Sequence, residues 1–130
     1  MLIIDDIDFS DVVIIDKLEE AFELAEGEAS VITQANEDWY DITGTRYTHT
    51  VSILRNDEAS PDRWDEFYNL VTKPVDFHKI EIDHNQSSIT YFAHIYSGAR
   101  SLVRVVGGKK IWSDLTLTFR PSKPQREAED

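Results

Sequence analysis

The sequence predicts an α+β fold that is mainly antiparallel β, built as a β-sandwich or split barrel with one packed α-helix at about residues 61–72. Three observations predict it. Apolar and polar residues alternate over 47–53, aromatic residues recur at helical spacing over 64–71, and Gly107-Gly108 separates two strand-like runs. A chain of 130 residues can bury one core, so we expect a single β-rich domain at 1–121 and a disordered tail at 122–130.

The first third of the chain predicts strands and a long loop. Residues 2–4 are typical of an edge strand, and the β-branched run 12–15 favours a second strand. Residues 16–26 fit both helical spacing and an extended segment with glutamates outward, and we favour the extended form. Residues 27–41 predict a loop that contains a short strand at 31–32, and loops of this length usually have a function or fold onto a partner.

The middle of the chain predicts a strand followed by a short helix. Residues 42–54 alternate with one half-buried face. Ser60-Pro61 then supplies an N-cap hydroxyl and a proline at the first helical position, where its missing N–H is not needed. The apolar stripe of this helix consists of Trp64, Phe67, Tyr68 and Val71, and Pro74 ends the helix.

Four strands are predicted after the helix, at 77–83, 89–96, 101–106 and 109–119, with a turn at 84–87 and a break at Gly98. A tight turn at Gly107-Gly108 would place Val106 opposite Lys109, Arg104 opposite Ile111 and Val103 opposite Trp112. Apolar side chains would then lie on both faces of the sheet. We therefore expect the helix to cover one face and a neighbouring subunit to cover the other.

Charge is unevenly distributed along the chain, whose formal net charge is −12. Residues 1–41 hold thirteen of the 25 acidic residues and only one of the 13 Lys and Arg residues, whereas bases prevail over 100–126. This polarity disfavours general nucleic-acid binding and suits subunits that meet unlike end to unlike end, although ordinary solvated faces would show the same pattern. Without cysteine, an export signal or a long apolar run, we expect no disulfide, no export and no membrane insertion.

Neither a catalytic site nor a cofactor or metal site is predicted. His78 and His84 lie about 20 Å apart on an extended strand, too far to share an ion, while His49 and His94 fit alternating patterns typical of wall residues. No serine has the setting of a nucleophile elbow, and the only glycine pair stands between strands instead of before a helix. Nothing indicates a desolvated carboxylate pair among the many acids of residues 5–28.

The order of five segments resembles small structural proteins of long-tailed bacteriophages and prophages, of the tail-tube and distal-tail kind. The resemblance spans about residues 40–121, and its segments read DITGTRY (41–47), WDEFY (64–68), KPVDFH (73–78) and WSDL with FRP (112–115 and 119–121). It implies a β-sandwich or split barrel with one helix and a non-enzymatic subunit that forms a ring, commonly six-fold, around the channel that DNA traverses. It also implies assembly in the bacterial cytoplasm, other tail proteins as partners, and a final place in the virion tail.

A ring needs two complementary surfaces on each subunit, and the charge pattern suggests where they lie. We expect acidic residues within 16–41 to line the channel or to contact the basic region 100–123 of the next subunit. The candidate interface residues are Lys109, Lys110, Arg104, Trp112, Glu19, Glu20, Glu23, Trp39 and Tyr40. One alternative is a monomeric carbohydrate- or protein-binding module that uses the Trp39/Tyr40 loop, and another is a small enzyme with an acid site in a closed pocket.

Overall fold

The computed structural model describes residues 1–26, 31–32, 38–39, 42–56 and 58–127. Along the chain the elements are β1 (Leu2–Ile4), β2 (Ile7–Asp8), β3 (Val13–Glu26), β4 (Val31–Ile32), β5 (Asp38–Trp39), β6 (Ile42–Arg55), α1 (Pro61–Val71), β7 (His78–His84), β8 (Ser87–Val106), β9 (Lys109–Pro121) and β10 (Arg126–Glu127). The predicted mainly antiparallel β fold with a single helix is confirmed, and the extended form of residues 16–26 is correct. No helix in the described part of the chain is long and apolar enough to cross a membrane.

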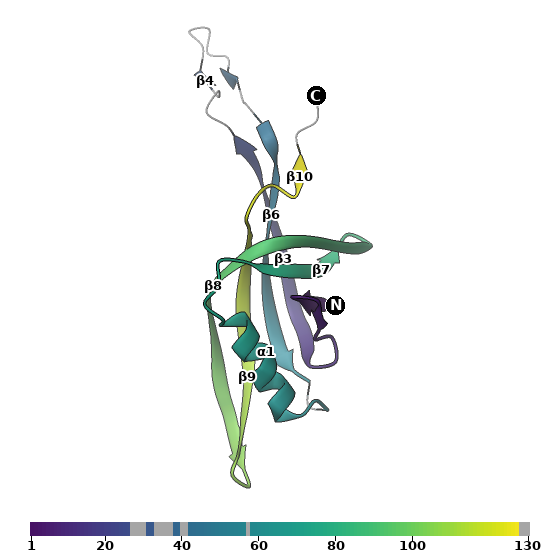
Figure 1. Cartoon of the computed structure of the whole chain (residues 1–130), viewed down its shortest axis with the longest axis vertical. Coiled ribbons are helices and arrows are strands. Elements are labelled where there is room, and N and C mark those ends of the chain that lie inside the picture. Colours follow the sequence, from purple (N-terminus) through teal and green to yellow (C-terminus); the bar gives the residue numbers. More distant parts are fainter. Residues whose placement is uncertain (27–30, 33–37, 40–41, 57, 128–130) are drawn as a thin grey trace.

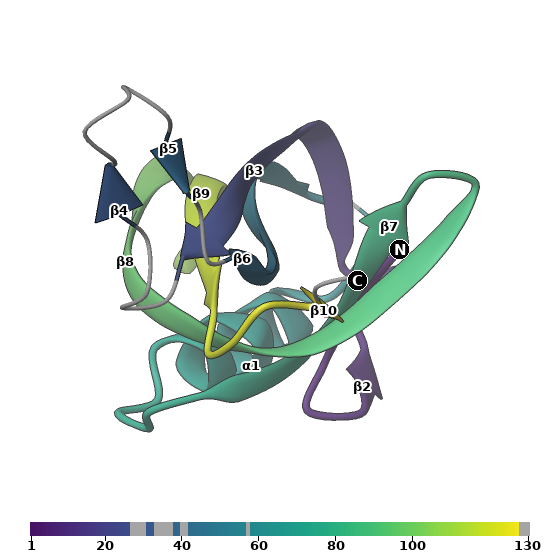
Figure 2. The same ribbon diagram turned by 90° about the horizontal axis from the view of Figure 1, so that it is seen from above.

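Eight strands form one antiparallel sheet. β10, β6, β9, β8, β7, β1 and β2 follow one another, and β3 pairs with β6 along almost its whole length. The sheet curls without closing into a barrel, as the view along the long axis shows (Figure 2). β4 and β5 form a separate two-stranded sheet. Among the described residues, β3 at one end of the sheet has no backbone pairing with β7, β1 or β2 at the other end. The curl therefore has an open side between β3 and these strands.

The helix packs its aromatic side chains against the curled sheet. Ser60 caps it, since its side-chain oxygen accepts a hydrogen bond from the Arg63 amide at 3.3 Å. Trp64, Phe67 and Val71 are buried, and the Phe67 ring meets the Phe9 ring edge-on with 5.0 Å between centroids. The core joins these side chains to the inward residues of the strands, among them Leu2, Ile4, Val51, Ile53, Ile80, Ile82, Leu115, Leu117 and Phe119.

Two hairpins project from this core in opposite directions along the longest axis (Figure 1). One consists of the far halves of β3 and β6, and the other of the far halves of β8 and β9. The second hairpin turns at Gly107 and Gly108, whose φ angles of 56° and 79° confirm the predicted tight turn.

Several local expectations were wrong. β1 is not an edge strand, because the two-residue β2 pairs with its outer side. The break at Gly98 is absent: β8 runs through it with a shift of register, and a Cβ at this position would lie 2.9 Å from Leu117 Cδ2. The glycine therefore permits close packing of two strands instead of ending one. The pairings of Val106 with Lys109 and of Arg104 with Ile111 are correct, but a register shift between Leu102 and Arg104 places Leu102, not Val103, opposite Trp112.

The predicted tail, 122–130, is described as far as residue 127, and part of it pairs with β6. Arg126–Glu127 pairs with Gly44 and Thr45 of β6. The Gln125 side chain prepares this pairing, because it accepts a hydrogen bond from the Tyr47 amide at 2.9 Å and donates one to the Tyr47 carbonyl at 2.8 Å. A side-chain amide thus replaces the backbone of a neighbouring strand, which composition alone does not indicate.

Candidate assembly interface

The acidic end of the molecule is the hairpin formed by the far halves of β3 and β6. Glu19 and Glu23 are exposed there, but each has a basic neighbour: Lys17 Nζ lies 2.8 Å from Glu19 Oε1, and Glu23 is the register partner of Arg46. Phe22 and Leu24 are unusually exposed for apolar side chains, at 71% and 53%. The surface at this end is therefore apolar as well as acidic, which the charge count did not reveal.

The opposite hairpin carries the basic candidates. Lys109 and Lys110 follow the turn and are exposed, while Val105 and Val106 just before it are 57% and 59% exposed. Arg104 lies on β8 beside them, with only its backbone described. Each projecting hairpin thus combines an excess of one sign of charge with exposed apolar side chains, and the two stand at opposite ends of the molecule (Figure 1).

Trp112 has a structural role at the base of the basic hairpin. The Arg100 guanidinium lies between two rings, 3.6 Å from the centroid of Tyr68 and 4.3 Å from that of Trp112. Asp65 on α1 is 3.8 Å from the same guanidinium. These contacts fasten the hairpin to the helix, so a half-buried Trp112 can fix the angle at which the hairpin projects.

Glu20 differs from the other acidic candidates, because its carboxylate is held by two histidines. Its Oε1 lies 2.8 Å from His49 Nε2 on β6 and within hydrogen-bond distance of His84 Nδ1 on β7. Burial raises the pKa of Glu20, but the hydrogen bonds to His84 and His49 outweigh burial and leave the pKa below its ordinary value. Ionised Glu20 holds β3 against β7, two strands that are not neighbours in the sheet.

His49 connects this carboxylate to the core. Its ring is fully buried, stacks on Tyr91, and places Nδ1 2.7 Å from the Tyr91 hydroxyl. Burial lowers the pKa of His49 and raises that of Tyr91, so a neutral imidazole faces a protonated phenol. Because a carboxylate only accepts, Nε2–H donates to Glu20 and Nδ1 accepts from the Tyr91 hydroxyl. Cross-strand pairing of Glu20 with His49 could have been found from a correct register of β3 and β6, but the approach of His84 depends on the curl of the sheet.

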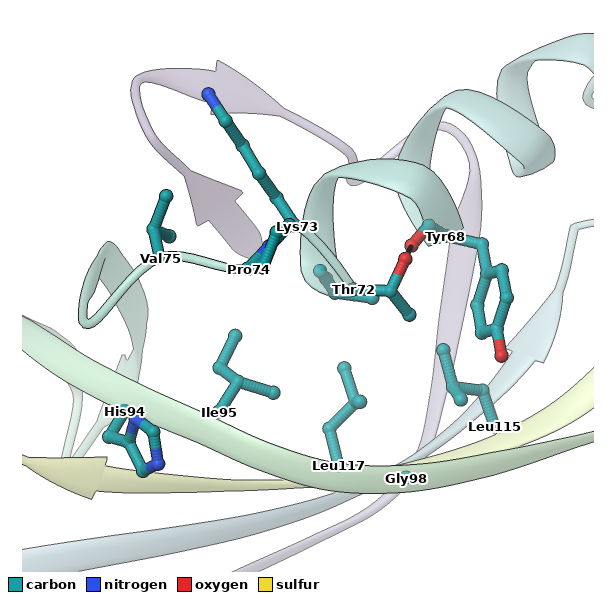
Figure 3. A pocket seen from close by; sticks show the side chains of 11 residues that line it. Tyr68, Thr72, Lys73, Pro74, Val75, His94, Ile95, Gly98, Leu115 and Leu117 are labelled. Carbon is teal, nitrogen blue, oxygen red and sulfur yellow. Dashed lines mark hydrogen bonds between the residues drawn. The ribbon is translucent and has the colours of Figure 1, made fainter.

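A groove of about 450 Å³ lies between the end of α1 and the strands β8 and β9 (Figure 3). Tyr68, Ile95, Leu115 and Leu117 point into it, and none of its lining residues is a carboxylate. The only histidine at its wall, His94, contacts the Asp76 carbonyl oxygen through Nδ1 at 3.0 Å. The groove is thus lined by both apolar and polar side chains, and its lining offers no pair of acidic groups for general acid–base chemistry.

The remaining two candidates cannot be placed as side chains. Trp39 belongs to β5, of which the backbone is described, and Tyr40 lies outside the described residues. The structure therefore gives no geometry for a Trp39/Tyr40 binding surface.

The comparisons with known proteins agree with the fold. No protein-family model and no curated protein matches the chain. Among solved structures, the chain is similar to Dit (gp 19.1) of phage SPP1, described as a paradigm of the hub adsorption apparatus in phages that infect Gram-positive bacteria. The TM-score is 0.51 at 18% identity, and the match covers 95% of this chain and 49% of Dit. The chain thus spans about half the length of that protein, and the resemblance to distal-tail proteins is confirmed at the level of the fold.

Proposed function

We propose that this protein is a non-enzymatic structural subunit of a phage or prophage tail, which associates with copies of itself into a ring. The observation that carries the proposal is the similarity of nearly the whole chain to the fold of a phage hub protein. A tail component assembled in the bacterial cytoplasm and carried in the virion is consistent with it. Docking onto other tail proteins follows as a second contact of the same subunit.

The two projecting hairpins support a head-to-tail contact in such a ring. Exposed Phe22 and Leu24 at one end and exposed Val105 and Val106 at the other are apolar surfaces that association would remove from water. Glu23 at one end and Lys109 and Lys110 at the other add opposite charge. A surface that pairs with a different surface on the next copy is heterologous, and such contacts close into rings when the rotation per subunit permits.

Light scattering on a sizing column tests this contact. We expect wild-type protein to form a closed oligomer and Phe22→Ser with Leu24→Ser to be monomeric, because both side chains are already exposed and their loss leaves the monomer fold intact. Ile14→Ser on the same strand is the matched control, since Ile14 is 49% exposed but lies away from the acidic end, and it should assemble like wild type. Wild type that stays monomeric at every salt and concentration would contradict the proposal.

A charge-swap experiment separates specific pairing from a general effect of charge. Lys109→Glu with Lys110→Glu places like charges opposite Glu19 and Glu23 of the next copy, and Glu19→Lys with Glu23→Lys places like charges opposite Lys109 and Lys110, so each variant alone should fail to assemble. Mixed in equal amounts, the two should form alternating oligomers, because every contact then joins unlike ends. If both variants assemble alone, or if the mixture remains monomeric, these hairpins are not the interface.

A further inference from the structure

Three strands bring three potential metal ligands together on the inner side of the curled sheet. Glu20 comes from β3, His49 from β6 and His84 from β7, and one ligand atom from each lies within 4.8 Å of the others. Both imidazoles contact the same carboxylate oxygen, Oε1 of Glu20. Two nitrogen atoms and one oxygen atom thus converge on a common point, at the open side of the sheet.

We propose that Glu20, His49 and His84 bind a zinc ion. Two imidazoles and one carboxylate form a ligand set that suits Zn²⁺, and water would occupy the fourth position of the tetrahedron. Side-chain exposures of 34% for Glu20 and 19% for His84 leave a path for the ion and that water. Zinc bonds of about 2.0–2.2 Å require the three ligand atoms to separate slightly from their present contacts, and the partly exposed Glu20 and His84 side chains can rotate to allow it.

The surroundings of His49 fit a ligand. Its ring is fully buried and oriented by stacking on Tyr91, so Nε2 is held toward the site. With zinc on Nε2, the proton moves to Nδ1 and is donated to the Tyr91 oxygen, 2.7 Å away. Metal-bound histidines usually donate their second ring N–H in this way, which fixes the ring and raises its basicity. Tyr91 is therefore a positioning residue for the proposed site.

Zinc would give the site a structural role. β3 and β7 are separated in the sheet by β6, β9 and β8, and no backbone pairing joins them among the described residues. An ion held by ligands from both strands would hold the curled sheet together across its open side, as an interstrand cross-link does. Binding only to the folded form would also raise the melting temperature with zinc concentration.

The test uses the full chain without an affinity tag, stripped of metal with a chelator. Calorimetric titration with Zn²⁺ should show one ion per chain, and Co²⁺ should give the intense visible absorption of a tetrahedral site. His84→Gln and Glu20→Gln should each weaken zinc binding at least tenfold and abolish the cobalt spectrum. His94→Gln is the matched control: His94 is not one of the three ligands, so this variant should bind like wild type.

Further measurements distinguish a loss of zinc binding from a loss of folding. Circular dichroism of the metal-free proteins should show that His84→Gln and Glu20→Gln keep the wild-type spectrum. Should one of them unfold, the other carries the comparison, and Tyr91→Phe, which leaves all three ligands in place, should weaken zinc binding about 10–100-fold. Absence of zinc binding to stripped wild type, or wild-type affinity in both ligand variants, would overturn the proposal.

Discussion

Tyr91→Phe removes one hydroxyl from the interior and gives a measurable test of the buried network. Tyr91 is 8% exposed, and its hydroxyl lies 2.7 Å from Nδ1 of fully buried His49. Phenylalanine keeps the ring and its stacking but leaves this nitrogen without its partner. A buried polar atom that loses its hydrogen bond costs about 1–3 kcal/mol, so the free energy of unfolding should fall by that amount. For a chain of this size, 1 kcal/mol corresponds to about 4 °C, which predicts a melting temperature lower by about 4–12 °C.

The assay is urea unfolding of metal-free protein at pH 7, followed by tryptophan fluorescence. Tyr68→Phe is the matched control, because Tyr68 is only half-buried and its ring, on which Arg100 stacks, is retained. We expect this control to change the free energy of unfolding by less than about 0.5 kcal/mol. If both variants unfold at the same urea concentration, the Tyr91–His49 hydrogen bond does not stabilise the protein and the argument for this network is wrong.

Two further predictions concern the ends of the chain. Burial raises the pKa of Asp5, but hydrogen bonds from His78 at 2.7 Å and from the Lys79 amide at 2.9 Å outweigh burial and lower the pKa. This stabilisation is fully present above the unfolded pKa of 3.8 and is lost as the pH falls through the lower pKa of the folded state. Asp5→Asn should therefore destabilise the protein more at pH 7 than at pH 3, as urea midpoints would show; equal losses at both pH values would refute it. Gly44→Ala would place a Cβ 2.7 Å from Pro124 Cβ and against the Arg126 carbonyl, so we expect β10 to detach and trypsin to cleave after Arg126 about tenfold faster, with an unchanged unfolding midpoint of the remaining protein. Wild-type cleavage rates would show that β10 tolerates the added methyl group.

Short sequence signals predicted those features of the fold that depend only on neighbouring residues. Ser60-Pro61 determines where α1 begins, and glycines at 107 and 108 supply the positive φ angles of the tight turn. The fold class followed from these signals together with the alternation in β6. Each of them depends on backbone geometry that one or two residues decide, independently of distant parts of the chain.

Features that depend on the path of the sheet could not be predicted. Gly98 indicates a break when only its neighbours in sequence are considered, but its reason is the close approach of Leu117 from β9. Spacing along one strand places His78 and His84 far apart, whereas curling of the sheet brings His84 to Glu20 and His49. Glu20 consequently seemed to be one of several surface acids, and its role as a link between β3 and β7 required the three-dimensional arrangement.

The side chains of β3 affect both the proposed assembly and unwanted strand pairing between free subunits. β3 is fourteen residues long, and its outer edge has no backbone partner among the described residues, which makes it a template for uncontrolled strand pairing. Charged side chains along this edge, including Lys17, Glu19 and Glu23, oppose such pairing in the free subunit, because an added strand would have to desolvate them. Phe22 and Leu24 project from the opposite face of β3, because successive side chains of a strand alternate between its faces, so the proposed partner must reach both the charged and the apolar face. The basic hairpin around Gly107 and Gly108 carries exposed apolar and basic side chains, which supports the head-to-tail contact that we propose.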